Sequence, residues 1–202
     1  LGLVVLFATI FGITLAARTL TEEFQKGTIK QLLIRPRKRA TVLFSKYITV
    51  LLTILFILFV GTLFAMIIGG IVMDGSKTEL TVGIFLKIIV YQLVSPFFFA
   101  TLAFFLANIF RKSVLPLLIT LFLFFLQKAI NMMLLAFAPG VAKFLVFTHL
   151  NLNVYDSNTF ISGGGKPPFE GFTFTTSFLL VIAYFVVLLV AASLSFQKRD
   201  IL

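Results

Sequence analysis

The sequence predicts an all-α protein, a polytopic bundle of membrane-spanning helices that forms one transmembrane domain over residues 1–202. Hydrophobic residues make up 60% of the chain, charged residues make up 12%, and the mean hydropathy is +1.13. Several apolar runs also exceed the roughly 20 residues that a helix needs to cross a bilayer. A soluble domain of this length could not bury so much apolar surface, so we expect that surface to face lipid or other membrane helices.

Five spans follow from the apolar runs. The opening run, about 1–17, is slightly short, and we count it as a fifth span beside four longer ones. It begins at Leu1 without a basic stretch, which is not the pattern of a signal peptide, and we expect a further segment upstream. The four longer runs cover about 46–73, 82–110, 114–138 and 173–196.

Lys and Arg in the connections predict the orientation, because cytoplasmic connections of membrane proteins carry an excess of them. We therefore expect residues 18–45, residues 111–113 and the C-terminus to be cytoplasmic, in a multi-pass protein of a bacterial plasma membrane. The bias alternates along the chain: basic in 18–46, neutral in 74–81, basic at 111–112, neutral in the outer connection 139–172, and basic in the tail.

The same features exclude several function classes. The net charge of +10 comes from residues at the ends of apolar runs, so it indicates membrane topology and not nucleic-acid binding. The chain has no Cys, which excludes disulfides, thiolate metal sites and a Cys nucleophile. The stretch from Gly163 to Lys166 lacks the Ser or Thr of a phosphate-binding loop, because Pro167 follows it.

We expect no enzyme activity in this chain, and no catalytic, cofactor or metal site. Glu22 and Glu23 are adjacent carboxylates, but a protease that works within the membrane would need further acids and His as metal ligands there. The single His, His149, lies in the outer connection instead.

Small residues and prolines predict details of packing. Small side chains recur at every fourth position from Ala8 to Ala16 and from Gly61 to Gly69, which allows close approach of helices either within the chain or between subunits. Pro96 predicts a kink in its span, and Ser113 is a candidate N-cap for the next one. In the outer connection, the apolar stretch from Val141 to Leu152 predicts a short interfacial or re-entrant helix.

The most informative segment is the basic connection after the first span. Thr19 and Glu22 have the spacing of a capping box, which predicts an amphipathic helix over about 20–35 that ends before Pro36. Such a helix either rests on anionic lipid headgroups or lays its apolar face into a groove of a soluble partner.

The residues of this segment, Glu23-x3-Gly27-Thr28-x3-Leu32-Leu33-x2-Pro36-x2-Arg39-x6-Lys46, resemble the signature of permease subunits of type-2 ABC exporters. The C-terminal Phe196-x2-Arg199-Asp200-Ile201 is similar to that family as well. The resemblance implies six spans in the full chain, five of them in this stretch, with 20–35 as a cytoplasmic coupling helix. It implies the following ATPase-coupling residues: Glu22, Glu23, Phe24, Gly27, Thr28, Leu32, Leu33, Pro36 and Arg39.

The resemblance also implies partners. These are two cytoplasmic ABC ATPase subunits, which bind ATP and Mg, and a second permease subunit, identical or paralogous. Export would proceed by alternating access. The mostly apolar spans favour a hydrophobic or amphipathic substrate such as a peptide, a drug or a lipid-like molecule.

Three polar residues stand inside the fourth span, about 114–138. Gln127, Lys128 and Asn131 share a helix face, and Lys128 lies about 15 Å from the outer end of its span by helical rise. Polar groups at that depth line a translocation path or bond to neighbouring helices. Lys87, near the outer end of its own span, is more simply a snorkelling residue. The alternatives to an exporter are an ATP-independent transporter or channel, and a membrane-bound immunity or scaffold protein.

Overall fold

Five long helices make up most of the described chain, which in this computed structural model comprises residues 1–25, 39–72, 82–110 and 112–198. Each is long and apolar enough to cross a membrane. Among these residues the regular secondary structure consists of helices, without a strand, which confirms the prediction of an all-α membrane protein with five candidate spans. The five are α1 (Gly2–Gln25), α3 (Arg39–Val72), α4 (Val82–Phe110), α5 (Val114–Phe137) and α8 (Phe174–Lys198).

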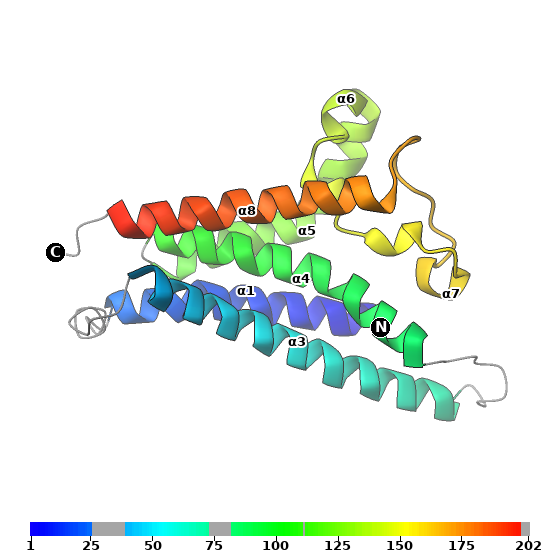
Figure 1. Cartoon of the computed structure of the whole chain (residues 1–202), viewed down its shortest axis with the longest axis horizontal. Coiled ribbons are helices and arrows are strands. Elements are labelled where there is room, and N and C mark those ends of the chain that lie inside the picture. The colour runs from blue at the N-terminus through cyan, green and yellow to red at the C-terminus, as the bar shows by residue number, and fades with distance from the viewer. Residues whose placement is uncertain (26–38, 73–81, 111, 199–202) are drawn as a thin grey trace.

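The helix ends lie at two opposite ends of the bundle. α1 runs from the end where the outer connection lies to the opposite end, and α3 returns (Figure 1). The end of α1, the start of α3, the end of α4 and the end of α8 therefore lie together. This is the end to which the sequence assigns the basic connections, and we refer to it as the basic end.

The outer connection forms several short helical pieces and not one helix. The prediction of a single helix from Val141 to Leu152 is wrong, because the backbone is extended at Leu145 (φ −74°, ψ 127°). These pieces pack against α4, α5 and α8, although α6 stands apart above α8 in Figure 1. They are α6 (Pro139–Ala142), η2 (Val146–Thr148), η3 (Leu152–Tyr155) and α7 (Thr159–Ser162).

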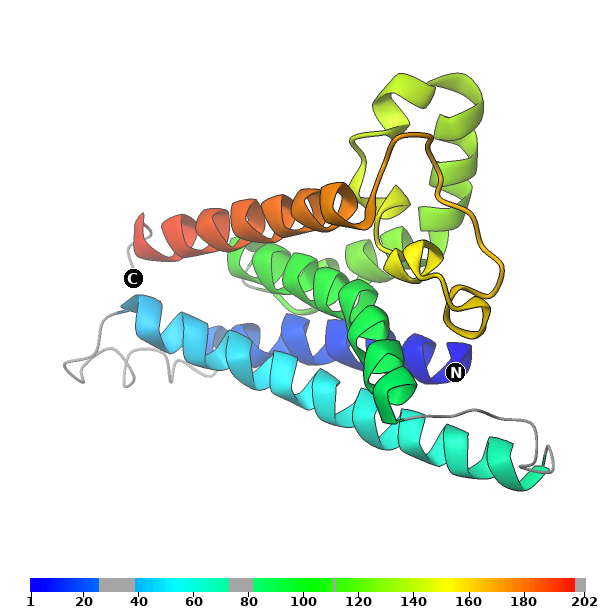
Figure 2. The same cartoon turned by 45° about the vertical axis from the view of Figure 1, so that its right-hand side comes forward.

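α4 is the central helix of the bundle. It packs against each of the other four long helices, and half of its apolar span is buried inside the protein. Pro96 lies within it, and Figure 2 shows that the axis of α4 changes direction along its length. Because Pro96 has no N–H, the carbonyl of Gln92 loses its partner in the helix, which favours a bend here.

Aromatic rings fill the centre of the core. Phe98 and Phe99 of α4 are almost fully buried. Phe98 has its ring centroid 6.1 Å from that of Phe185 on α8, and Phe99 lies 5.2 Å from Phe124 on α5. Phe147 of the outer connection contacts both at about 6 Å. Such edge-to-face and stacked pairs each contribute about 0.5–1.5 kcal/mol beyond the area that they bury.

The first small-residue stripe packs inside the chain. Ala8 and Ala16 are fully buried, and a Cβ at Gly12 would lie 2.7 Å from Cδ1 of Ile54 on α3. Gly61 of the second stripe likewise faces Val4 of α1, whereas Gly69 has no atom near the position of a Cβ. The close approach that these glycines allow therefore joins α1 to α3 within one chain.

Several buried threonines bond to the backbone of their own helix. Thr9, Thr21 and Thr120 each donate to the carbonyl four residues earlier, which satisfies the hydroxyl without a second helix. The prediction that Ser113 is an N-cap of α5 is wrong. Its backbone is already helical (φ −79°, ψ −31°) and its hydroxyl makes no capping bond, so it is not a side-chain N-cap.

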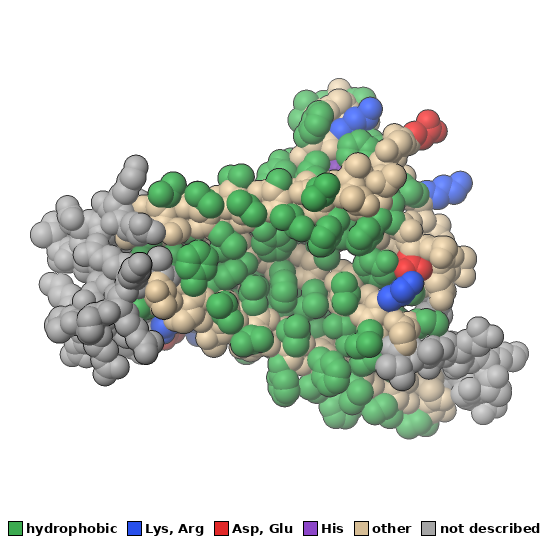
Figure 3. All heavy atoms as spheres, in the orientation of Figure 1, with side chains coloured by type: hydrophobic (Ala, Val, Ile, Leu, Met, Phe, Trp, Pro, Cys, Tyr) green, Lys and Arg blue, Asp and Glu red, His purple; other side chains and the backbone are tan. Residues whose placement is uncertain are grey.

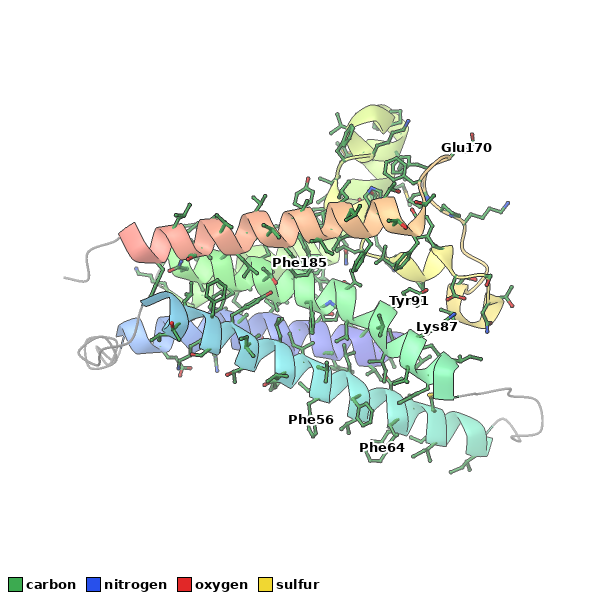
Figure 4. The ribbon with its side chains drawn as sticks, in the orientation of Figure 1. Phe56, Phe64, Lys87, Tyr91, Glu170 and Phe185 are labelled. Carbon is green, nitrogen blue, oxygen red and sulfur yellow. The ribbon has the colours of Figure 1, made fainter. Side chains whose placement is uncertain are left out.

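The outward faces of the helices are apolar. Phe56 and Phe64 of α3 are 65% and 58% exposed and point away from the bundle in Figure 4. Figure 3 shows hydrophobic side chains over the whole visible length of the bundle, whereas most of the visible charged side chains lie toward its ends. This is the pattern expected of a surface that lies in the hydrocarbon core of a bilayer.

Candidate functional site

A cavity of about 630 Å³ opens at the outer end of the bundle, near the bend in α4. Its size is within the range of pockets that bind small molecules. Its walls come from the start of α1, the outer half of α4, the middle of α5 and the outer connection. The lining residues include Val5, Ile88, Tyr91, Gln92, Ser95, Gln127, Lys128, Asn131, Phe147, Leu150, Asn153 and Ile161.

The structure brings the three predicted path residues to this cavity. Gln127, Lys128 and Asn131 all line it from α5. Lys128 is exposed, Gln127 and Asn131 are partly buried, and the lining includes no carboxylate. Lys128 is the only charged side chain among the described residues that form the wall, so the cavity presents positive charge.

The side-chain amides of Asn131 and Asn153 each donate a hydrogen bond through their nitrogen, which fixes the position of their oxygen. Nδ2 of Asn131 donates to the carbonyl of Phe147 at 2.9 Å, and Nδ2 of Asn153 donates to the carbonyl of Ile161 at 3.3 Å. Because a carbonyl can only accept, these bonds fix which amide atom is nitrogen. The two Oδ1 atoms are buried and have no hydrogen-bond partner.

Sequence reasoning missed the contribution of α4 and of the outer connection to this cavity. Gln92 accepts a bond from Thr62 of α3 at 3.3 Å, and Ser95 adjoins Pro96. A polar pair within an apolar span, one turn before a proline, was a usable signal for these two residues. Asn153 gave no such signal, because asparagine is common in connections that do nothing more than turn.

An ion pair fastens the outer connection to α4. Lys87 lies 3.4 Å from Asp156, and the hydroxyl of Tyr91 donates to the same carboxylate at 3.0 Å. Figure 4 shows Lys87 and Tyr91 at the end of α4 that faces this connection. Lys87 keeps 60% of its side chain exposed, so it combines the expected outward reach with a specific partner.

The surroundings of Asp156 predict that the stability of the outer connection depends on pH. The backbone N–H of Asn158 bonds to its carboxylate at 2.8 Å, and together with Tyr91 and Lys87 it lowers the pKa of Asp156 against the opposing effect of burial. A lowered pKa stabilises the fold above the unfolded value of about 3.8, and this contribution is lost as the pH falls through the folded pKa.

We therefore expect amide protection at residues 156–159, corrected for intrinsic exchange, to be constant between pH 5 and 7 and to fall below about pH 4. The measurement is hydrogen exchange with mass spectrometry. In Asp156→Asn, protection should already be reduced at pH 7 and should not change with pH. An equal loss in the variant and the parent at pH 3 only, with no difference at pH 7, would contradict this role of the ion pair.

A buried polar cluster joins the outer connection to α8. The carbonyl of Lys143 lies 2.9 Å from Nε2 of His149, so Nε2 donates. Nδ1 then accepts from the hydroxyl of Ser177 at 2.9 Å, and Ser177 accepts from Tyr155 at 2.8 Å. His149 is 1% exposed, with Phe172 stacked on it at 5.1 Å. We call His149, Ser177, Tyr155 and the Lys143 carbonyl the histidine clasp.

The clasp contains a Ser beside a His but is not arranged for nucleophilic catalysis. Ser177 is fully buried and its hydroxyl is used twice, so no substrate carbonyl can reach it. Across 1–25, 39–72, 82–110 and 112–198, no three His, Asp or Glu side chains lie close enough to hold a metal ion.

The predicted coupling residues lie at the basic end or outside the described residues. α1 continues without a break through Thr19 to Gln25, so Glu22, Glu23 and Phe24 lie in its last turns, and Glu22 is exposed. Arg39 begins α3. Gly27, Thr28, Leu32, Leu33 and Pro36, together with the C-terminal Arg199, Asp200 and Ile201, lie outside the residues that the structure describes.

The prediction of a capping box at Thr19 is wrong. The hydroxyl of Thr19 donates to the carbonyl of Leu15 at 2.6 Å, within the continuous helix α1. A Thr in mid-helix makes this bond in place of a capping bond, and the following Glu22 then marks no helix start.

The fold and the cavity define the class of this protein: it is a polytopic α-helical membrane protein. The chain belongs to the family described as "Protein of unknown function (DUF2705)", whose model matches residues 1–202. Two relatives come from Bacillus subtilis (strain 168). The uncharacterized protein YhcI is 35% identical over 95% of this chain, and the uncharacterized membrane protein YdbK is 25% identical over 94% of it. The chain spans 64% of the length of YhcI and 76% of that of YdbK.

Proposed function

We propose that this chain is the membrane-spanning permease subunit of an ATP-driven exporter of the type-2 ABC class. It pairs with a second permease subunit and with two cytoplasmic ATPase subunits that bind ATP and Mg. It moves a hydrophobic or amphipathic substrate out across the bacterial plasma membrane by alternating access. The basic end, with the connection after α1 and the C-terminus, faces the cytoplasm.

The observation that carries the proposal is the residue pattern from Glu23 to Lys46, which resembles the coupling segment of that class. Its position in the chain supports the proposal, because it joins α1 to α3 at the basic end. Both helices also pack against α4. A force applied to this connection by an ATPase would therefore act on three spans together.

The distribution of charge supports the direction of transport. Lys and Arg gather in the connections of the basic end, where cytoplasmic connections are expected. The polar cavity that Gln127, Lys128 and Asn131 line lies at the opposite end. We assign these three residues to the translocation path, near its exit.

For the first test, membranes that contain the full-length protein are solubilised in mild detergent. The protein is then purified, and every chain that co-elutes with it is identified. The proposal expects an ABC ATPase in a stable complex. The parent and the Glu23→Lys variant are then each reconstituted with that ATPase. The variant should show ATP-driven transport at least tenfold slower than the parent, because it reverses a charge in the segment proposed to contact the ATPase.

Glu170→Lys is the matched control, since it makes the same charge change in the outer connection, where Glu170 is exposed (Figure 4). It should transport like the parent, and both variants should insert normally into the membrane. Transport that needs no ATPase and survives Glu23→Lys would instead identify an ATP-independent transporter.

A further inference from the structure

The outer cavity combines three recognition elements in one place. Its walls include the apolar side chains of Val5, Ile88 and Leu150, and it holds one cation, Lys128. Asn131 and Asn153 also line it, and the Oδ1 atom of each is buried without a hydrogen-bond partner. Buried acceptors of this kind are rare in folded proteins, and each is stabilised by the arrival of a donor.

The electrostatics of the wall favour an anion. Lys128 has no carboxylate beside it in the cavity lining. Asp156, which accepts a hydrogen bond from Tyr91 of the wall, is already paired with Lys87. The charge of Lys128 is therefore available to a negatively charged ligand group.

The spacing of these groups limits the class of ligand that can bind. Lys128 and Asn131 are three residues apart on α5, so their Cβ atoms lie about 5–6 Å from each other on one helix face. A ligand that satisfies both must carry an anionic group and an N–H or O–H donor on adjacent parts of its structure. The apolar wall requires a hydrocarbon portion next to them.

We propose that the outer cavity binds amphiphiles in which a secondary amide N–H adjoins a carboxylate, as in N-acyl amino acids and the C-terminal ends of apolar peptides. The carboxylate pairs with Lys128, and the apolar chain lies along Val5, Ile88 and Leu150. The amide N–H donates to Oδ1 of Asn131, which a rotation of that side chain uncovers toward the cavity. Asn153 accepts a second donor where the ligand has one. This inference rests on the proposed function, because it names the ligand class of the assigned path.

The probe is radiolabelled N-dodecanoylglycine, at concentrations below those at which it forms micelles. Binding is measured to the full chain without any ATPase, in nanodiscs of phosphatidylcholine, with empty nanodiscs subtracted. We expect saturable binding. Lys128→Gln should weaken it about tenfold or more, because it removes a charge-assisted hydrogen bond. Lys166→Gln, the same change at an exposed position of the outer connection, should bind like the parent.

Matched ligands test the amide. N-dodecanoylsarcosine has the same chain and carboxylate but a methylated nitrogen, so it lacks the donor for Asn131 and should bind about tenfold more weakly. The glycinamide analogue lacks the carboxylate and should bind weakly and equally to the parent and to Lys128→Gln. Displacement of the probe by acetyl-trileucine would identify a peptide end as the preferred source, and displacement by longer acyl glycines alone would identify a lipid-like one.

Binding that does not saturate, or that is unchanged in Lys128→Gln and for the sarcosine analogue, would overturn the inference. Because Lys128 is exposed, its replacement should not affect folding, and size-exclusion chromatography checks this. The outcome is separate from that of the exporter proposal. Absence of probe binding, with an ABC ATPase found among the co-purified chains, refutes the ligand class alone. Saturable probe binding, with no ATPase found among the co-purified chains, refutes the energy source alone.

Discussion

Gly12→Leu is expected to destabilise the folded protein by about 2–3 kcal/mol, because the new side chain has no space between α1 and α3. Even its Cβ would lie 2.7 Å and 2.9 Å from two atoms of Ile54. Ile54 is fully buried, so it cannot move aside without displacing the core. The measurement is resistance to unfolding by sodium dodecyl sulfate or by heat, in detergent, against the parent protein.

Gly69→Leu is the matched control for this change. It introduces the same side chain into an apolar helix, at a position where a Cβ has no neighbour within 4 Å. Leu has the higher helix propensity, by up to about 1 kcal/mol, so this control should be neutral or stabilising. Equal destabilisation by both variants would show that the loss of Gly itself matters, and not the close approach to Ile54.

His149→Ala is expected to detach the outer connection from α8. The change removes the acceptor of the buried Ser177 hydroxyl, which keeps only its bond from Tyr155. It also removes the donor to the Lys143 carbonyl and creates a cavity beside Phe172. Each unsatisfied buried group costs about 1–3 kcal/mol. The local free energy of opening should fall accordingly, whereas the five long helices should keep their packing.

Trypsin provides the measurement for this variant. In the outer connection Lys143 is followed by Phe144 and can be cut, whereas Lys166 is followed by Pro167 and is resistant. Cleavage after Lys143 should be at least tenfold faster in His149→Ala, since the Lys143 carbonyl is held by the clasp in the parent. Glu170→Gln, an exposed change in the same connection, should leave the rate unaltered. An unaltered rate in His149→Ala would mean that the clasp does not restrain this segment.

The five spans were predictable because their cause is local. A long apolar run that meets lipid must satisfy its own backbone, and only a helix does this within one segment. The ends were less predictable, since charged and polar residues at a membrane surface tolerate helix as well as coil. α3 thus begins at Arg39, within the basic connection, and not near 46.

The residues that α5 contributes to the cavity were predictable from the sequence, whereas those from other segments were not. Gln127, Lys128 and Asn131 share a face of one helix, and their unusual polarity is visible in the sequence. Their partners come from far along the chain, and no local pattern joins Asn131 to Phe147 or Ser177 to His149. The Thr19 pattern failed because the same spacing fits an N-cap and a mid-helix Thr, and only the continuity of α1 distinguishes them.

The position of α4 has a consequence for how the two ends of the molecule can communicate. The helices that border the basic connection, α1 and α3, both pack on α4, and the outer half of α4 supplies Tyr91, Gln92 and Ser95 to the cavity. Pro96 lies between that outer half and the rest of the helix. α4 thus has two arms on either side of Pro96, one among the helices that reach the basic end and the other in the wall of the cavity. A tilt imposed on the first arm would therefore change the shape of the cavity.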